Sequence, residues 1–257
     1  MNSLSLTTMR RLKPALAAAA MVSLAGSLAF AGGGDPRNPW VVPPQSCAFG
    51  QSYAAWSVNF WQWALKLPAT QHPLFDTADV STGQSGPVWF LGGKFCPTTA
   101  GTQCNPQLAD RTCTIPEGKA LFFPIINAEA STIEGNGSTF IDLRNVAQSY
   151  TDPVDTTKLA CEVDGAPVKD LDQYRALSPL FDYTLAAHDN VWAAVGEPVP
   201  DGATTPSVSD GYYVMLDPLP AGKHTLHFHA EIPAFSYTLD VTYHLTVARD
   251  HGGHGGH

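Results

Sequence analysis

The sequence is poor in charged residues, and basic residues are the scarcer kind. Its 257 residues include 14 lysine and arginine residues against 23 aspartate and glutamate residues. Cleavage of residues 1–31 would remove three positive charges and leave 11 basic and 23 acidic side chains, a formal charge of −12. An acidic surface repels nucleic acid and anionic membranes, so neither is expected as a partner.

Several catalytic signatures are missing. There is no nucleotide-binding glycine loop and no P-loop lysine motif, so no nucleotide cofactor is expected, and no Gly-x-Ser-x-Gly elbow or His-Glu-x-x-His helix is present. Nothing near Cys161 would activate it as a nucleophile. Glu129, Glu134 and Asp217 are candidate glycosidase carboxylates, subject to their separation. The residues around Glu129 also fit a solvated loop, and the sequence leaves open whether the protein is an enzyme.

Long hydrophobic runs are also missing, and the longest apolar stretch lies at the N-terminus. Arg10, Arg11 and Lys13 precede an apolar segment over residues 15–30, and Ala29-Phe30-Ala31 follows as a cleavage signal. The pattern predicts a signal peptide over residues 1–31, cleaved near Ala31, and export to the periplasm or the extracellular space. A retained anchor is the alternative, but no membrane span is expected in the mature chain.

Cysteine is limited to five residues, which are Cys47, Cys96, Cys104, Cys113 and Cys161. An exported protein is expected to oxidise an even subset of them. Three of the five lie close together in the sequence, between residues 96 and 113, which predicts a local disulfide there. The pairing stays open, and so does a cysteine-based zinc site, although no Cys-x-x-Cys spacing favours the latter.

Glycine and proline are frequent, at 22 and 21 residues, which favours a turn-rich all-β protein. We expect one or more immunoglobulin-like or jelly-roll-type sandwiches with one N-terminal amphipathic helix. The expected parts are a region over 32–156 with a cysteine-rich loop, a β-sandwich over 157–248 and a disordered histidine–glycine tail over 249–257. Whether the two β regions form one domain or two is left open. Residues 139–150 predict a short helix, and residues 188–210 a long loop of the kind that covers a site.

The convincing helix lies between Ser52 and Leu67, where aromatic residues recur at spacings of three and four. Ser52 is a suitable N-cap and Pro68 ends the helix. This stripe is typical of a helix docked on a sheet, and the alternative is a platform that binds a polymer. Further along, the strand over residues 120–126 contains Pro124, which predicts a sheet edge or a bulge.

Two motifs resemble a known group of proteins. Trp56 to Trp63 reads Trp-x-x-x-Phe-Trp-Gln-Trp, and Ile115 to Pro124 reads Ile-Pro-x-Gly-Lys-Ala-Leu-Phe-Phe-Pro. In both, the chain resembles exported bacterial proteins of unassigned function. The resemblance implies one exported unit spanning most of the mature chain, and it carries neither an activity nor site residues.

Histidine is concentrated near the C-terminus. Between residues 223 and 247 two strands alternate apolar and polar residues, which places His227, His229 and His244 on one polar face. If His227 lies opposite His244, the three imidazoles meet, with Glu231 and Asp240 at the rim. Three histidines are a common copper or zinc ligand set. The alternative is a polar outer face, and a one-residue slip would remove the site.

The last residues repeat histidine between pairs of glycines. Histidine-rich tails of this kind capture transition metals, and the alternative is a disordered end with no role. The spaced histidines are His251, His254 and His257.

The function that these patterns favour is an exported copper- or zinc-binding protein with its site on the last hairpin. One alternative is a secreted metal-dependent hydrolase with Glu231 or Asp240 as general base. Another is a non-catalytic envelope- or polymer-binding module that uses the aromatic helix. The sequence does not indicate a protein partner or an oligomeric state.

Overall fold

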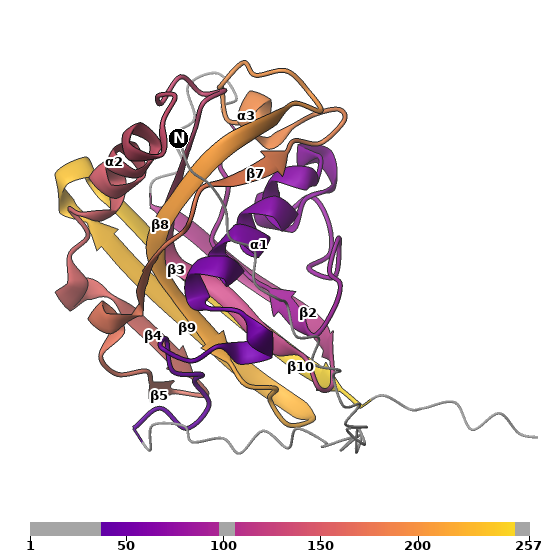
Figure 1. Ribbon diagram of the computed structural model, residues 1–257. Coiled ribbons are helices and arrows are strands. Elements are labelled where there is room, and N and C mark those ends of the chain that lie inside the picture. The colour runs from indigo at the N-terminus through magenta and orange to yellow at the C-terminus, as the bar shows by residue number, and fades with distance from the viewer. Residues whose placement is uncertain (1–36, 98–105, 250–257) are drawn as a thin grey trace, which may run out of the picture. The chain divides into compact units, whose positions relative to one another are not determined.

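Strands with alternating polar and apolar residues assemble into two five-stranded sheets in the computed structural model, which describes residues 37–97 and 106–249 (Figure 1). The predicted signal peptide and the histidine tail lie outside these residues. Sheet A has the order β1-β3-β8-β6, and β7 also pairs with β8. Its strands are β1 (Val88–Phe90), β3 (Ala120–Ser131), β6 (Arg175–Leu177), β7 (Phe181–Thr184) and β8 (Thr204–Leu216).

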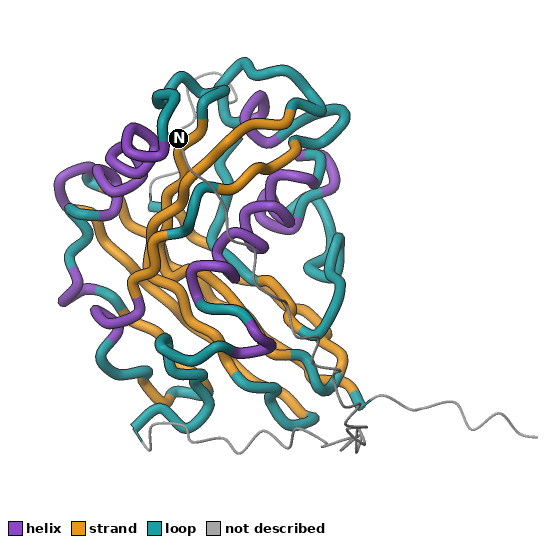
Figure 2. The backbone as a smooth tube through the Cα atoms, viewed as in Figure 1, coloured by secondary structure: helices purple, strands orange, loops and turns teal. Residues whose placement is uncertain are grey.

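Sheet B has the order β2-β10-β9-β4-β5. Its strands are β2 (Gln107–Pro116), β4 (Ala160–Val163), β5 (Ala166–Pro167), β9 (Gly222–Ile232) and β10 (Tyr237–Ala248). Both sheets are mixed, because β1 runs parallel to β3 and β2 runs parallel to β10. Figure 2 shows the helices at the periphery of the strands. They are α1 (Tyr53–Lys66), α2 (Phe140–Thr151) and α3 (Val191–Ala194).

The two sheets pack face to face through aromatic side chains. Phe123 of β3 stacks on Phe228 of β9 with ring centroids 5.2 Å apart, and Phe228 stacks in turn on Tyr243 of β10. The alternation predicted for the last two strands is confirmed, since Leu226, Phe228, Val241 and Tyr243 are buried while His227 and His229 are partly exposed. The apolar face of this hairpin therefore forms part of the core between the sheets.

The segment over residues 151–157, where the boundary between the expected parts 32–156 and 157–248 falls, does not separate two sheets. Sheet A pairs β3 with β8, and sheet B pairs β2 with β10, so each sheet contains strands from both sides of that segment. The described residues accordingly belong to one compact unit. Pairings between residues more than 70 positions apart leave no local pattern in the sequence, which is why this joining was not predicted.

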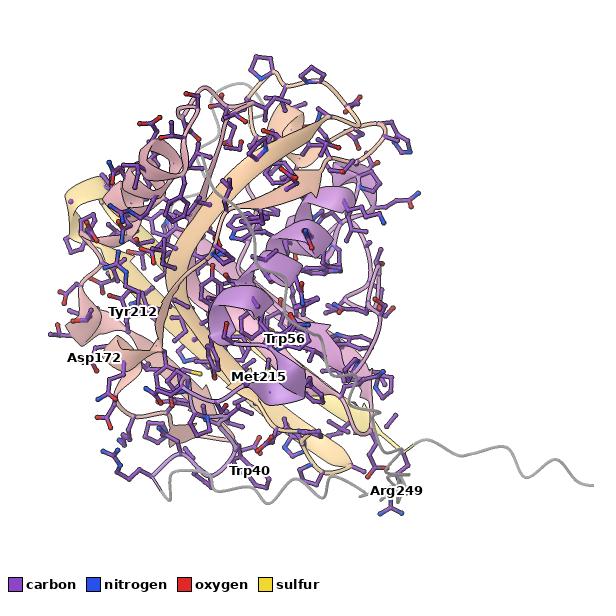
Figure 3. All side chains as sticks on the ribbon, viewed as in Figure 1. Trp40, Trp56, Asp172, Tyr212, Met215 and Arg249 are labelled. Atoms are coloured by element: carbon purple, nitrogen blue, oxygen red, sulfur yellow. The ribbon has the colours of Figure 1, made fainter. Side chains whose placement is uncertain are left out.

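Helix α1 coincides with the range expected from the aromatic stripe, and it packs on sheet A. Ser52 caps it by accepting a hydrogen bond from the backbone N–H of Ala55. Tyr53 donates its hydroxyl proton to the carbonyl of Val42 and accepts a hydrogen bond from the backbone N–H of Met215 on β8. Met215 and Trp56 are both labelled in Figure 3. Trp56, Phe60 and Trp63 are 2–8% exposed. Their burial agrees with a helix docked on a sheet and argues against the alternative, a polymer-binding platform on this stripe.

A β-bulge in β3 decides which residues face α1. The register to β8 shifts between Pro124 and Ile126, which confirms the bulge predicted from the proline. Before the bulge, Phe122 faces α1 and packs against Tyr53. The extra residue changes the alternation, so that Glu129 projects toward the same side, where it meets Ser207 of β8. Without the bulge, Ala128 would take that place.

Among Cys47, Cys113 and Cys161 the structure contains no disulfide, and the last two are buried thiols. Cys104 lies outside the described residues, so the predicted local bridge stays a prediction. No helix in residues 37–97 and 106–249 is long and apolar enough to cross a bilayer.

Candidate functional site

The candidate site is a cavity of about 370 Å³ at one end of sheet A. Its ionisable lining consists of three glutamates and one tyrosine, and no lysine, arginine or histidine is among the described residues that line it. The residues come from α1, β3 and its following turn, α2, α3 and two loops. They are Trp61, Phe95, Ala128, Glu129, Glu134, Asn136, Tyr150, Trp192 and Glu197.

Glu129 is the most deeply placed carboxyl group of this pocket. Its side chain projects from the middle of sheet A, and the residue is only 8% exposed. Oε1 accepts a hydrogen bond of 3.0 Å from the hydroxyl of Ser207. Among the described residues the buried Oε2 has no hydrogen-bond partner of standard geometry. The Tyr183 hydroxyl lies near this carboxyl group but donates its proton to Ser131. A charged carboxylate in this position would be poorly solvated, which favours the protonated acid.

Glu134 lies beside Glu129 and is a hydrogen-bond partner for its carboxyl group. The two carboxyl groups are within hydrogen-bonding range, and a hydrogen bond between them requires one proton. Burial raises the pKa of Glu129 well above its usual range, and the charge of Glu134 raises it further. Burial also raises the pKa of Glu134. Both shifts favour one proton shared by the pair, with Glu129 as donor and Glu134 as acceptor.

A chain of hydrogen bonds fixes Glu134 from the other side. Trp192 donates its indole N–H to the Tyr183 hydroxyl at 2.9 Å, and Tyr183 donates to Ser131 at 2.9 Å. Ser131 donates to Oε2 of Glu134. The chain links α3, β7 and β3, so a ligand that moves Trp192 would also act on the carboxyl pair.

Aromatic rings form the walls of the pocket. Trp61 lies between Phe95 and Trp192, with ring centroids at 6.5 and 6.4 Å. Tyr150 is 49% exposed and stands at the rim. Trp192 and Glu197 belong to the segment over residues 188–210, which was expected to be a loop covering a site, and both line this pocket. The segment is only partly a loop, because it contains α3 and the start of β8.

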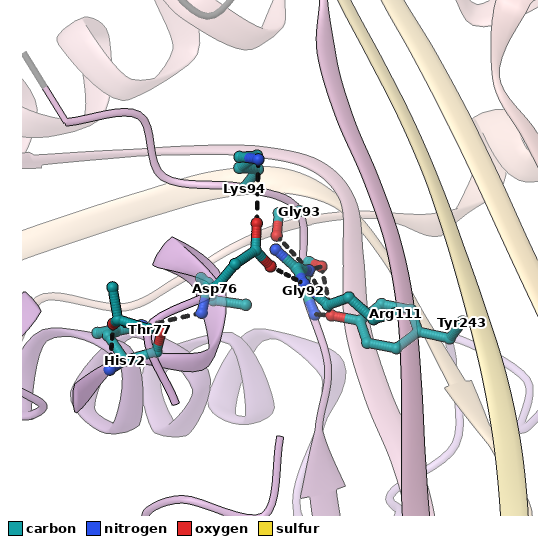
Figure 4. Close-up of polar contacts among 9 residues, drawn as sticks. His72, Asp76, Thr77, Gly92, Gly93, Lys94, Arg111 and Tyr243 are labelled. Atoms are coloured by element: carbon teal, nitrogen blue, oxygen red, sulfur yellow. Dashed lines mark hydrogen bonds and ion pairs between the residues drawn. The ribbon is translucent and has the colours of Figure 1, made fainter. Parts of the chain in front are cut away.

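A buried arginine secures the segment that carries Phe95 (Figure 4). Arg111 donates from Nη1 to the carbonyl oxygens of Gly92 and Gly93 at 3.0 and 2.8 Å, and its Nε lies 2.6 Å from Asp76. Asp76 also pairs with Lys94 at 3.0 Å, next to Phe95 in the chain. This cluster positions a wall of the pocket. Nη1 of Arg111 also donates to the Tyr243 hydroxyl at 2.7 Å, whereas the buried Nη2 has no hydrogen-bond partner among the described residues.

Of the three candidate glycosidase carboxylates named from the sequence, Glu129 and Glu134 meet in one pocket. Asp217 does not line it and lies just beyond the far end of β8. The direct contact between Glu129 and Glu134 is closer than the separation of about 5–5.5 Å in retaining glycosidases or about 6.5–9.5 Å in inverting ones. The glycosidase arrangement considered from the sequence is therefore not the one present.

The histidine hairpin has a register other than the expected one. His227 lies opposite Thr242, and His244 lies opposite Thr225, so the assumed pairing of His227 with His244 is wrong by two residues. The connection over residues 233–236, a short 3₁₀ turn ending at a left-handed Ser236, sets this register. A shift of two preserves the predicted faces but separates the predicted neighbours.

Each histidine of this face pairs with a carboxylate. His227 Nε2 lies 3.3 Å from Asp240, and His229 Nδ1 lies 3.0 Å from the same group. His229 Nε2 also lies 3.3 Å from Glu231, and His244 Nε2 lies 3.1 Å from Asp110. Within the described part of the chain, no three histidine, cysteine, aspartate or glutamate side chains are arranged to hold a metal ion. Copper or zinc binding by His227, His229 and His244 stays a prediction, as it does for His251, His254 and His257 outside the described residues.

Deletion of residues 250–257 separates the two histidine sets. The shortened protein loses stoichiometric binding of Cu²⁺ or Zn²⁺ if the tail histidines alone are the ligands, because the hairpin histidines then keep their pairing with Asp240, Glu231 and Asp110. Isothermal titration of both ions into the full-length and shortened proteins measures this. Retention of about one ion per shortened chain would instead assign the site to the hairpin.

Comparison with known proteins assigns no family. No family model matches the sequence, and no curated protein matches it. A structure of PbICP-C in complex with falcipain-2 is similar at 9% identity, with a TM-score of 0.22, over 63% of this chain and all of that one. The cysteine protease inhibitor EhICP2 from Entamoeba histolytica is similar at 14% identity, with a TM-score of 0.17, over 56% and 99% of the two chains. Likeness at this level carries no functional argument.

Proposed function

We propose that this protein binds a small organic cation, such as a quaternary ammonium compound, in the pocket of Glu129 and Glu134. The observation that carries the proposal is the lining: aromatic rings form the walls, and carboxyl groups supply the charge. A cation is attracted to the negative face of an aromatic ring by about 0.5–2 kcal/mol per contact. Anions and neutral sugars would meet neither a basic group nor a full set of donors here.

The dimensions of the pocket agree with a ligand of this kind. Its volume of about 370 Å³ lies within the range of small-molecule sites. Trp61 and Trp192 line the inner side, and the half-exposed Tyr150 lines the entrance. Glu129 lies deep in the pocket, while Glu134 is half-buried and Glu197 is exposed, so a charged head would enter first and leave an uncharged or polar end at the rim.

Choline and its neutral carbon analogue, in which a tert-butyl group replaces trimethylammonium, test the proposal. We expect choline to bind at least about tenfold more tightly, because only the charge differs between the two. Isothermal titration gives the affinities. Quenching of tryptophan fluorescence by the ligand shows where it binds: the ligand lies at Trp192 if Trp192→Phe removes most of the quenching. Equal affinities, or no binding of either compound or of putrescine as a slimmer cation, would refute the proposal.

A hydrolase is the second candidate, and the shared proton is the observation that favours it. One protonated and one ionised carboxyl group in contact can act as acid and base toward a bound water. A hydrolytic role predicts turnover of an ester or amide that Glu134→Gln abolishes, whereas a binding protein shows no turnover with choline esters.

Other expectations from the sequence stand as separate proposals. Export through the predicted signal peptide, copper or zinc binding by the histidines and a metal-dependent hydrolase centred on Glu231 or Asp240 each await their own measurement. The same holds for an immunoglobulin-like or jelly-roll relationship of the sandwich. For export, the test is N-terminal sequencing of the secreted protein. Cleavage near Ala31 predicts that its first residue lies just after residue 31.

A further inference from the structure

We infer that cation binding in this pocket displaces the proton held between Glu129 and Glu134, so that the protein exchanges one proton for one organic cation. The inference rests on the proposed function and adds the coupling that the pocket imposes on it. It predicts that pH controls occupancy of the site.

The geometry of the carboxyl pair requires this proton in the empty pocket. Oε2 of Glu129 is buried without a hydrogen-bond partner of standard geometry among the described residues, and Glu134 is its acidic neighbour. The nearby Tyr183 hydroxyl donates its proton to Ser131. Two ionised carboxylates in contact repel each other strongly in a poorly hydrated site, and one proton removes that repulsion. The proton therefore compensates for the absence of a positive charge.

The groups around the pair offer no other compensation. The titratable groups that face it are Glu197 from the loop after α3, Tyr183 from β7 and Tyr150 from α2. Glu197 adds negative charge and itself contributes to the raised pKa of Glu134. A bound ammonium group would supply the positive charge that this set lacks, and the second carboxyl group could then ionise.

Competition between proton and cation fixes the direction of the pH dependence. Because the empty site holds one proton more than the occupied site, affinity for the cation rises with pH by up to about tenfold per unit. The rise ends where the empty pair has lost its proton. At lower pH the proton wins, and the cation is released.

Proton release is measured directly by adding choline to the full-length protein in unbuffered salt solution and titrating the liberated acid. We expect close to one proton per bound choline near neutral pH, and an infrared band of the protonated carboxyl group that disappears on binding. Glu129→Gln should release clearly less than one proton per bound choline, and its affinity should depend less steeply on pH, because only Glu134 then titrates in the pair.

The outcomes separate this inference from the proposed function. Choline binding without proton release in the natural protein overturns the exchange and leaves the binding function intact. Absence of choline binding overturns both. If Glu129→Gln does not fold, the infrared band in the natural protein decides alone, since its persistence in the choline complex overturns the exchange.

Discussion

Replacing Glu134 with lysine should lower choline affinity at least about 100-fold. The new ammonium group would lie among Glu129, Glu197 and the aromatic walls, and would occupy the place of the ligand's own charge. The variant thus removes an attractive carboxylate and adds a competing cation in a buried site, where each effect is worth well over 1 kcal/mol. Isothermal titration with choline measures the loss.

Two matched variants give this result its meaning. Glu117→Lys makes the same change of charge at an exposed turn between β2 and β3, and it should alter affinity less than about twofold. Glu134→Gln keeps the size of the side chain, and its effect should be intermediate. Equal losses in Glu134→Lys and Glu117→Lys would mean that only the net charge of the protein matters, and the pocket would not be the binding site.

The sequence predicted those features that depend on neighbours along the chain. Ser52 and the aromatic spacing located α1. Helix α2 (Phe140–Thr151) forms where a helix was expected, and a capping box between Thr139 and Asp142 begins it. Alternation identified the inner and outer faces of β9 and β10, and Pro124 identified the bulge. Each of these rests on a local rule of capping, periodicity or backbone chemistry.

The register of the last hairpin shows where local rules end. Alternation restricts the pairing of His227 to outward-facing residues of β10, but it does not choose between Thr242 and His244. The choice lies in the turn over residues 233–236, whose 3₁₀ conformation no spacing rule specified. A two-residue difference was enough to replace an expected histidine cluster with pairs of histidine and carboxylate.

The pocket was harder still to predict, because its residues come from distant elements. Glu129 faces α1 only because of the bulge, and its aromatic neighbours Trp61 and Trp192 are 131 residues apart in the sequence. The available signals were partial: two glutamates after a buried strand, and a long loop with a tryptophan at residue 192. Their meeting depends on the pairing of β3 with β8, which only long-range structure provides.

Replacing Arg175 with leucine should destabilise the protein by about 3 kcal/mol or more. Arg175 is the cation that compensates the charge of Asp210, a carboxylate on β8 with no exposed surface. Its guanidinium donates hydrogen bonds to Oδ2 of Asp210, one of them from Nε at 2.9 Å. Asp210 also accepts from Thr151 at the end of α2. Removing one partner of a buried pair leaves the other charge uncompensated, which is far costlier than losing a surface pair. Urea unfolding of both proteins measures the difference.

The cause can be separated from a simple loss of packing. Adding Asp210→Asn to Arg175→Leu removes the unpaired charge and should recover a large part of the lost stability. Arg37→Leu breaks an exposed pair with Asp170 and should cost less than about 1 kcal/mol. Because Thr151 follows Tyr150 of the pocket rim, Arg175→Leu should also loosen α2 and weaken choline binding, whereas Arg37→Leu should not. A double variant as unstable as Arg175→Leu alone would mean that the guanidinium stabilises the fold through packing on Tyr212 rather than through Asp210.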